Sequence, residues 1–227
     1  MTKHMSIAID GPSGVGKSTL AKNLSERLGY AYVDTGAMFR TFAVLFLDKG
    51  IAPEDEEGIR RALEDTEISI RYEDGVQRMI LNGSDVTDRL RTEEVSHMAS
   101  VSSQYSCVRE RLLAVQRELA ESNDVIMDGR DIGTVVLPDA GLKVFLTADS
   151  GVRALRRYNE YKEKGILNGR TVEDVEKEIL DRDYRDSHRD IAPLKAAEDA
   201  FILDTSRLNA DEVTERIIEK LNESKTC

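Results

Sequence analysis

A short glycine-rich segment near the N-terminus constrains this chain more than any other feature. Residues 11–18 read Gly-Pro-Ser-Gly-Val-Gly-Lys-Ser, which matches the pattern G-x-x-x-x-G-K-[ST] at every fixed position. The apolar run at residues 6–9 predicts a buried strand before it, and leucines at helical spacing over residues 18–28 predict a helix after it. This order of strand, tight loop and helix predicts a loop that cradles nucleotide phosphates.

The residue types in this loop explain the expected chemistry. Glycines allow the backbone to curl so that successive N–H groups point at phosphate oxygens, and the following helix adds its positive end. We expect Lys17 to reach the β and γ phosphates of ATP, and the Ser18 hydroxyl to ligate Mg²⁺. The alternative is a glycine turn with an incidental lysine, and the flanking strand and helix argue against it. The expected ATP-binding residues of the loop are Gly11, Pro12, Ser13, Gly14, Val15, Gly16, Lys17, Ser18 and Thr19.

Short apolar segments alternate with longer amphipathic ones along the rest of the chain. We expect further strands at residues 31–33, 125–127, 144–146 and 201–203, and further helices at 39–49, 53–63, 107–121, 151–164, 171–185 and 210–221. Strands that alternate with helices predict an α/β fold with three layers and a mainly parallel sheet.

One region departs from this alternation. Ile68, Ile70 and Tyr72 alternate with polar residues, Asp74-Gly75 marks a turn, and a second expected strand follows at 76–81 before another turn at Asn82-Gly83. Alternation on both sides of a turn predicts a β-hairpin. A hairpin within an α/β chain predicts a small inserted subdomain around residues 65–90.

The charge of the chain narrows the classes of partner. With 43 acidic and 32 basic residues, the formal net charge is −11. Polynucleotide binding depends on excess Lys and Arg, so we expect no nucleic acid polymer as a partner. No apolar run approaches the roughly 18 residues of a membrane span, and we expect no membrane partner. The two cysteines, Cys107 and Cys227, lack metal-ligand spacing and are expected to be free thiols in a reducing cytoplasm.

Positive charge is instead gathered in two groups of arginines. Phosphoryl transfer needs such charge around the moving group. One group has helical spacing i, i+3, i+4, and the other i, i+3, i+7; they are Arg153, Arg156 and Arg157, and Arg182, Arg185 and Arg189. The two expected helices have few apolar residues and flank a loop at 165–169, so we expect them to form a mobile cover that excludes water.

These arginines have a simpler interpretation as members of solvated ion pairs. Asp186 follows Arg182 by four residues, and Glu160 follows Arg156 by four. For a single arginine the two interpretations are evenly balanced. Both groups following a complete phosphate loop favour the interpretation as phosphate ligands.

A further motif, Asp128-Gly129-Arg130-Asp131, ends a predicted buried strand. In open α/β sheets the carboxyl ends of the strands face the ligand crevice. Asp128 is either part of that site or a turn cap. Arg130 is expected beside a phosphate, because a buried guanidinium without a partner is costly.

The phosphate loop, the segment 34–40 (Asp-Thr-Gly-Ala-Met-Phe-Arg) and the motif at 128–131 together resemble the bacterial cytidylate kinase family. The resemblance continues through residues 153–157, 182–189 and 192–194. It implies a single P-loop kinase domain over 1–227, with a monophosphate-binding insert at about 38–105 that contains the hairpin, and a helical lid at about 153–189. Some members of the family carry Gly where this chain has Ser18, which leaves the role of that hydroxyl open.

The resemblance implies transfer of the γ-phosphoryl group of ATP to CMP, and also to dCMP, with Mg²⁺ as cofactor in a cytoplasmic monomer. The residues implied in catalysis are Lys17, Arg130, Arg156, Arg157, Arg182 and Arg189, with Arg157 also binding ATP. Those implied in binding the monophosphate, its sugar and its base are Thr35, Arg40, Ser100, Arg109, Arg130, Asp131, Arg182, Asp186 and Arg189. The alternative for Arg109 is an ion pair with Glu110 or Glu94.

Two other functions remain open at this point. One is a kinase for another small acceptor, such as a different nucleotide or shikimate; the hairpin and the segment 35–40 count against it. The other is a nucleotide-gated switch. Switches carry a metal-binding Asp-x-x-Gly and a base-reading loop like Asn-Lys-x-Asp, and this chain has neither at a suitable position.

Overall fold

The structure is a computed structural model that describes residues 4–73 and 75–226. The chain forms two compact units. Among the described residues, the phosphate-loop unit comprises 5–31 and 124–226, and the insert unit comprises 32–123 together with His4. The turn residue Asp74 and the terminal Cys227 lie outside the described residues, while Cys107 is a free thiol.

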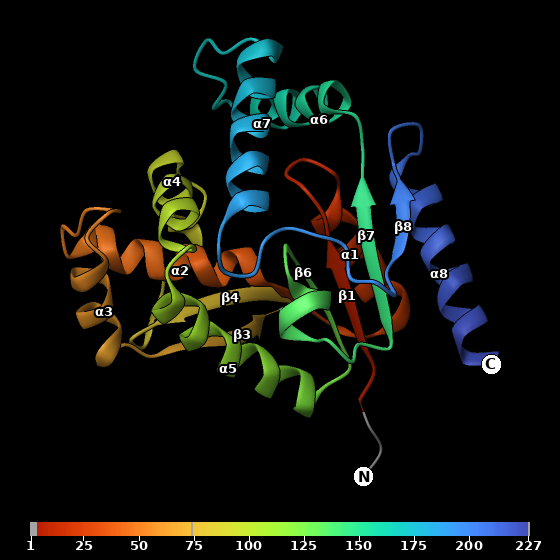
Figure 1. Ribbon diagram of the computed structural model, residues 1–227, viewed down its shortest axis with the longest axis horizontal. Helices are drawn as coiled ribbons and strands as arrows, with labels where there is room; N and C mark the ends of the chain where they lie inside the picture. The colour runs from red at the N-terminus through yellow and green to blue at the C-terminus, as the bar shows by residue number, and fades with distance from the viewer. Residues whose placement is uncertain (1–3, 74, 227) are drawn as a thin grey trace. The chain divides into compact units, whose positions relative to one another are not determined.

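A parallel sheet organises the phosphate-loop unit (Figure 1). Strand β1 (Ser6–Asp10) pairs in parallel with β6 (Val125–Gly129) on one side and with β7 (Leu142–Thr147) on the other. Strand β8 (Phe201–Asp204) pairs in parallel with β7. The edge strand β2 (Ala31–Asp34) completes the order β2-β6-β1-β7-β8, and the chain passes into the insert unit within it. The predicted mainly parallel sheet is confirmed.

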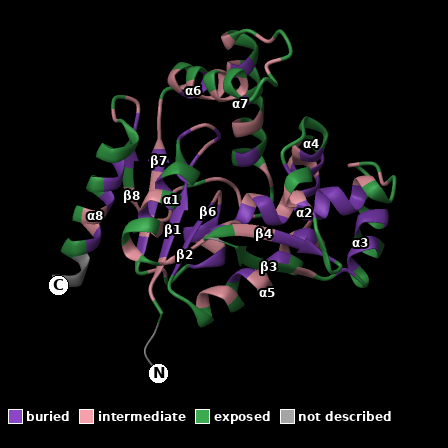
Figure 2. Cartoon of the chain, turned by 180° about the vertical axis from the view of Figure 1, so that it is seen from behind, coloured by how far each residue is buried: buried purple, intermediate pink, exposed green. Residues whose placement is uncertain are grey.

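Apolar strands at the centre of this sheet form the core. Ile7, Ala8 and Ile9 of β1 and Ile126 and Met127 of β6 are fully buried, as the purple strands in Figure 2 show. Helix α1 (Lys17–Leu28) contacts both strands and also packs against α8 (Ala210–Thr226). Because β1 and β6 pair with Asp10 opposite Gly129, the phosphate loop and the 128–131 motif leave the same edge of the sheet.

Helices α6 (Ser150–Glu163) and α7 (Val172–His188) pack against each other in the same unit. We expected few apolar anchors in these charged helices, and the structure shows one small group of them. Ala154, Val175 and Ile179 form a small buried core, with tyrosines packed against it. Helix α7 also runs beyond the predicted end at residue 185.

The insert unit contains α2 (Thr35–Asp48), α3 (Glu56–Glu64), α4 (Glu93–Ser102), α5 (Ser106–Ser122) and a separate sheet. In that sheet β4 (Val76–Leu81) pairs antiparallel with β3 (Ile68–Glu73) and β5 (Ser84–Asp85), followed by a turn of 3₁₀ helix at Thr87–Arg89. The predicted hairpin is confirmed. Asn82 and Gly83, at the second turn, have φ values of 47° and 82°, as its Asn-Gly sequence requires.

Three local features were missed from the sequence. Helix α2 begins four residues before the predicted residue 39, because the Asp34 carboxylate caps it by accepting from the Ala37 N–H. Helix α4 was not predicted, although Thr92 caps it in the same way. A turn of π-helix at Ile132–Val136 follows β6. No helix in the described part of the chain is long and apolar enough to span a membrane.

Candidate active site

The phosphate loop has the backbone conformation that its glycines predict. Gly11, Gly14 and Gly16 have φ values of 148°, 75° and 99°, which disfavour any residue with a side chain. At Gly11 a Cβ atom would lie only 2.4 Å from the Leu146 carbonyl oxygen of β7. The loop therefore passes against the end of the neighbouring strand. Ser18 and Thr19 are exposed at the start of α1.

Lys17 lies buried in the curl of this loop. Its Nζ donates hydrogen bonds to the Gly11 carbonyl at 2.8 Å and to the Pro12 carbonyl at 2.7 Å. Burial and the nearby charge of Arg130 lower the pKa of Lys17 well below its usual value. An anion beside these cations would relieve the repulsion, so the loop is electrostatically prepared for phosphate.

Ser18 and Asp128 meet at the carboxyl edge of the sheet. The Ser18 hydroxyl donates to the Asp128 carboxylate at 2.9 Å, and Asp128 is 5% exposed at the end of β6. Within the described ranges no three His, Cys, Asp or Glu side chains cluster closely enough to hold a metal ion. A hydroxyl and one carboxylate fit Mg²⁺, which retains several waters and takes its remaining ligands from substrate phosphates.

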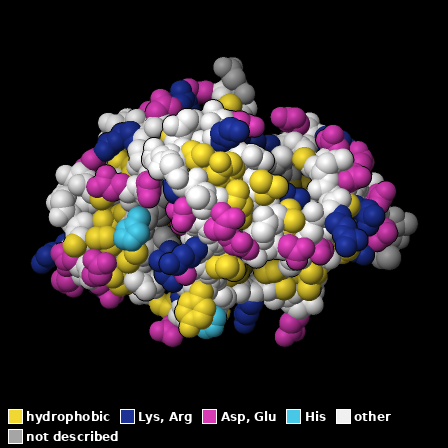
Figure 3. Space-filling model, turned by 90° about the horizontal axis from the view of Figure 1, so that it is seen from above, with side chains coloured by type: hydrophobic (Ala, Val, Ile, Leu, Met, Phe, Trp, Pro, Cys, Tyr) yellow, Lys and Arg dark blue, Asp and Glu magenta, His cyan; other side chains and the backbone are white. Residues whose placement is uncertain are grey.

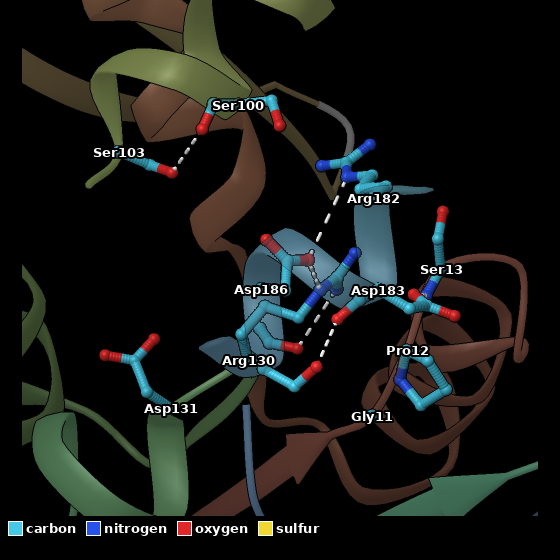
Figure 4. Close-up of polar contacts among 12 residues, drawn as sticks. Gly11, Pro12, Ser13, Ser100, Ser103, Arg130, Asp131, Arg182, Asp183 and Asp186 are labelled. Carbon is cyan, nitrogen blue, oxygen red and sulfur yellow. Dashed lines mark hydrogen bonds and ion pairs between the residues drawn. The ribbon is translucent and has the colours of Figure 1, made fainter. Parts of the chain in front are cut away.

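Arg130 and one arginine of the second group, Arg182, lie next to the same carboxylate. Arg130 Nε donates to Asp186 at 2.7 Å, and Arg182 Nε lies 4.0 Å from the same oxygen. Figure 4 shows the two guanidinium groups approaching Asp186 from different directions. Burial alone would raise the pKa of Asp186, but the charges of Arg130, Arg182 and Arg189 lower it overall. Cations and carboxylates thus alternate at this edge of the sheet, and Arg130 and Arg182 both lie next to the Asp186 carboxylate.

Asp131 follows Arg130 in the sequence, and its carboxylate pairs with Arg189. Arg189 Nη2 lies 3.5 Å from the Asp131 carboxylate, and its Nε donates to the Ala192 carbonyl at 2.7 Å. The turn that carries Asp131 is fixed by Asp10, which accepts from the Ile132 and Gly133 N–H groups at 2.9 and 2.7 Å. Burial raises the pKa of Asp10 to about 6.

The arginines of α6 have different partners. Arg153 is 6% exposed; it donates to the Ser13 carbonyl at 2.9 Å and to the Ala148 carbonyl at 3.0 Å, and it pairs with Asp183. Asp183 in turn accepts from the Ser13 N–H at 3.0 Å. Arg153 and Asp183 thus attach α6 and α7 to the phosphate loop, and the predicted common face of Arg153 with Arg156 and Arg157 does not form one cluster.

Arg156 and Arg157 diverge in the same way. Arg156 donates to the Thr205 carbonyl at 2.6 Å and to the Leu208 carbonyl at 3.3 Å, which fixes the loop between β8 and α8. Glu160, the acid considered for Arg156, pairs instead with Arg157 at 3.0 Å. The Arg157 guanidinium also lies 4.8 Å from the centre of the Tyr161 ring.

Arg185, the remaining basic residue of the predicted second group, is exposed. Arg182, Asp186 and Arg189 follow each other along one side of the end of α7, with spacing i, i+4, i+7, and Arg185 does not share it. The helical spacing predicted the existence of this group and included one wrong member.

In the insert unit, four predicted substrate residues lie on helices α2, α4 and α5. Thr35 is buried in the first turn of α2, and Arg40 pairs with Asp34 at 3.0 Å. Arg109 donates to the Ser103 carbonyl at 2.9 Å, and the Ser103 hydroxyl donates to the Ser100 carbonyl at 3.0 Å. Ser103 therefore links Ser100 to Arg109, whose guanidinium also lies 5.5 Å from the centre of the Phe39 ring.

Three carboxylates that shape the site were missed or left undecided. Asp10 directly precedes the phosphate loop, and Asp183 follows Arg182, but neither position reveals its partner in the sequence. Asp128 was considered as a turn cap, and it accepts from Ser18 instead. The surface seen from above in Figure 3 has acidic side chains spread among small groups of Lys and Arg. That view shows no continuous basic track of the kind that binds a polynucleotide.

Comparisons with known proteins agree with this geometry. The model of a family described as cytidylate kinase matches residues 7–223. Cytidylate kinase from Lactobacillus johnsonii is 46% identical over 215 residues, which cover 95% of this chain and 93% of that protein. Cytidylate kinase from Leuconostoc mesenteroides subsp. mesenteroides is 48% identical over 214 residues, which cover 94% and 95%.

The solved structure of shikimate kinase from Bacteroides thetaiotaomicron is similar with a TM-score of 0.52 at 16% identity, covering 96% of this chain and 98% of that one. A structural similarity at such low sequence identity shows a common fold, and it does not indicate which acceptor this chain phosphorylates. The predicted α/β P-loop kinase fold is confirmed.

Proposed function

The chain belongs to the cytidylate kinase family, and we infer that its reaction is the transfer of the γ-phosphoryl group of ATP to CMP, giving ADP and CDP. One observation supports this inference besides the family: an acidic chain brings the buried Lys17 and the half-buried Arg130 and Arg182 together at the carboxyl edge of its sheet. Their charge is suited to a phosphoryl group in transit between two nucleotides.

The chemistry of CMP requires little else from the protein. A nucleoside monophosphate near neutral pH already presents an anionic oxygen as the nucleophile, because its second pKa is about 6. No general base is needed, so the residues have to position the two nucleotides and neutralise charge. We propose that Lys17, Arg130, Arg182 and Arg189 neutralise the transferring group and that Asp186 binds the sugar. Arg157 remains a proposed contact of ATP, and Arg156 is proposed to act on the ATP side through the loop between β8 and α8 that it holds.

Mg²⁺ is the proposed cofactor. Ser18 and Asp128 are the residues that would hold it, since their hydroxyl and carboxylate are hard oxygen ligands at the phosphate loop. When bound with ATP, the ion would neutralise charge on the β and γ phosphates. The protein is proposed to act as a monomer.

Base selection is proposed for Arg109 and Ser100. Cytosine presents the N3 and O2 acceptors beside an N4 donor, and the Arg109 guanidinium offers several N–H donors in one plane. The Ser100 hydroxyl oxygen is buried, and no described residue hydrogen bonds with it, so it is available to the base. Asp131 remains our predicted acceptor for N4. Uracil has a donor at N3 and an acceptor at O4, which is the reverse of cytosine at these two positions. Such mismatched hydrogen-bonding groups cost a few kcal/mol of binding free energy.

The test is a panel of nucleoside monophosphates assayed with Mg-ATP. We expect CMP and dCMP to be phosphorylated, and UMP to be used with a kcat/KM lower by roughly 100-fold or more. Lys17→Ala should reduce kcat on the order of 100-fold in a folded protein and serves as the control for contaminating kinases. Turnover of shikimate, or ATP hydrolysis that no monophosphate accelerates, would contradict the proposal.

Arg109→Ala sharpens the same test. We expect it to lower kcat/KM for CMP more than for UMP, so that the gap between the two substrates narrows. An equal loss for both substrates would show that Arg109 does not read the base.

A further inference from the structure

Two side chains of the inserted hairpin reach the segment that leads into α2. Tyr72 of β3 and Gln77 of β4 are directly opposite each other in the antiparallel register. The Tyr72 hydroxyl donates to the Tyr32 carbonyl at 2.9 Å, and the Gln77 Oε1 accepts from the Asp34 N–H at 2.8 Å. Both contacts thus end on the backbone of residues 32–34.

Gln77 satisfies both backbone groups of Asp34. Its Nε2 also donates to the Asp34 carbonyl at 3.3 Å, so one carboxamide serves as acceptor and donor for the same residue. A primary amide has the same pair of groups as a peptide unit, and Gln77 therefore replaces the neighbouring strand that Asp34 would need at this point. The Met79 sulfur, 3.0 Å from Nε2, holds the carboxamide in this orientation.

The side chain of Asp34, whose backbone is held in place by Gln77, in turn binds the Ala37 N–H group and the Arg40 guanidinium. One carboxylate oxygen accepts from the Ala37 N–H at 2.8 Å and caps α2, and the other pairs with Arg40 Nη2 at 3.0 Å. A Cβ atom at Gly36 would lie 3.1 Å from both Arg40 Nη1 and the Asp34 carboxylate. The absence of a side chain at Gly36 therefore allows the guanidinium to lie close against the start of the helix.

The Arg40 guanidinium retains capacity for a ligand. Its Nε is buried, and no hydrogen-bond acceptor for it exists among the residues that the structure describes. A buried donor of this kind is costly, and an anionic oxygen is the partner that would satisfy it best.

We propose that Gln77, with Tyr72, is a positioning residue for the monophosphate: the hairpin fixes Asp34, and Asp34 aims Arg40 at the phosphate. This inference rests on the proposed function and on the role in monophosphate binding that the family resemblance implies for Arg40. It also assigns a task to the inserted sheet. The sheet fixes the start of α2 through the hydrogen bonds of Tyr72 and Gln77 to residues 32 and 34, and it need not contact the nucleotide.

The experiment compares Gln77→Ala and the similarly sized Gln77→Met with Val76→Ala, an exposed neighbour on the same strand. Loss of the two hydrogen bonds should raise the KM for CMP about tenfold, since each contributes on the order of 1 kcal/mol. The KM for ATP and kcat should change less than about twofold, and Val76→Ala should behave as wild type. Tyr72→Phe, which removes one hydroxyl, should raise the KM for CMP by about threefold.

A second measurement does not depend on activity. Hydrogen exchange at the Ala37 amide, which Asp34 caps, should accelerate in both Gln77 variants and remain unchanged in Val76→Ala. Circular dichroism identifies any variant that fails to fold, and Tyr72→Phe then carries the test as the milder change.

The outcomes separate this inference from the function on which it rests. Folded Gln77 variants with an unchanged KM for CMP and unchanged exchange at Ala37 would overturn the positioning role, even if the wild type phosphorylates CMP. An equal rise in the KM for ATP and for CMP would also overturn it, because it would indicate a general loss of structure. A wild type that ignores CMP would refute the proposed function alone, and the exchange measurement would still test the support of α2.

Discussion

The arginines on α6 and the arginines next to Asp186 were predicted to play similar parts, but the structure gives them different hydrogen-bond partners. Arg153 and Arg156 donate to backbone carbonyls of three loops, at Ser13, at Ala148 and at Thr205 with Leu208. Arg130 and Arg182 approach one shared carboxylate, Asp186. In the first group each guanidinium is occupied by a different part of the protein, and in the second several guanidinium groups share one acceptor.

This difference separates arginines that build the site from arginines that bind its ligand. Carbonyl acceptors saturate the N–H groups of a guanidinium, so exchanging them for phosphate would release a loop. Arg130 and Arg182 share the Asp186 carboxylate, so a phosphate that bound beside them would not have to release a loop. We therefore expect the Asp186 group to affect the reaction directly, and Arg153 and Arg156 to act through the loops that they hold.

The largest effect is expected within α7, where two arginines are one turn apart. Arg182→Met should lower kcat/KM for CMP on the order of 100-fold or more, because it removes charge from the group around Asp186. Arg185→Met, in the same helix but exposed, should stay within about twofold of the wild type. Steady-state kinetics on both variants measures the contrast, and similar losses in both would erase the distinction between the two faces of the helix.

An intermediate effect is expected for Arg156→Met, which releases the loop between β8 and α8. Loss of the hydrogen bonds to Thr205 and Leu208 should destabilise the protein by about 1–3 kcal/mol in urea unfolding. Because this loop adjoins the phosphate loop through the hydrogen bond from Thr205 to the Val15 carbonyl, the KM for ATP should rise more than the KM for CMP. A large fall in kcat with unchanged stability would instead place Arg156 with the ligand-binding arginines.

The last effect concerns Asp10 and is visible only as a pH dependence of stability. Burial raises its pKa from 3.8 to about 6 in the folded protein, so the folded state binds the proton more readily than the unfolded state. The contribution of Asp10 to stability therefore falls as pH rises from about 4 to about 6, by at most roughly 3 kcal/mol.

Asp10→Asn has no such titration. The difference in unfolding free energy between wild type and Asp10→Asn should decrease over this range and level off above it. Urea unfolding at several pH values measures that difference. A constant difference would show that Asp10 has the same pKa in both states.

Much of the fold was predictable, because it depends on local patterns. The phosphate loop, the central strands and the hairpin each have their signal within a few residues, such as the Gly-rich segment at 11–18 or Asn82-Gly83. Helix α4 was missed because its only clear signal is the Thr92 cap before a short amphipathic run. The early start of α2 depends on Asp34, which was interpreted as part of a motif and not as a helix cap.

The residues of the site were found more easily than their partners. Spacing placed Arg182 and Arg189 together, and it equally placed Arg153 with Arg156 and Arg157, although the structure separates them. What separates them is the position of Ser13, Asp183 and Thr205, which are far from α6 in the sequence. Partners brought in by tertiary packing leave no periodic signal, so one sequence cannot tell a structural arginine from a binding one.

The apolar core between α6 and α7 has a mechanical consequence. Ala154, Val175 and Ile179 make this helical pair a stiff arm, because bending it would open a close-packed contact. Any rigid-body movement of the helical pair is then confined to two hinges, one next to Asp149 and one after His188. At the second hinge Ala192 has a φ of 50°, a left-handed conformation that costs an alanine roughly 1 kcal/mol or more. A movement of α6 and α7 that let Ala192 adopt a right-handed or extended conformation would release this strain energy. The backbone strain at Ala192 would therefore favour such a movement over the observed position.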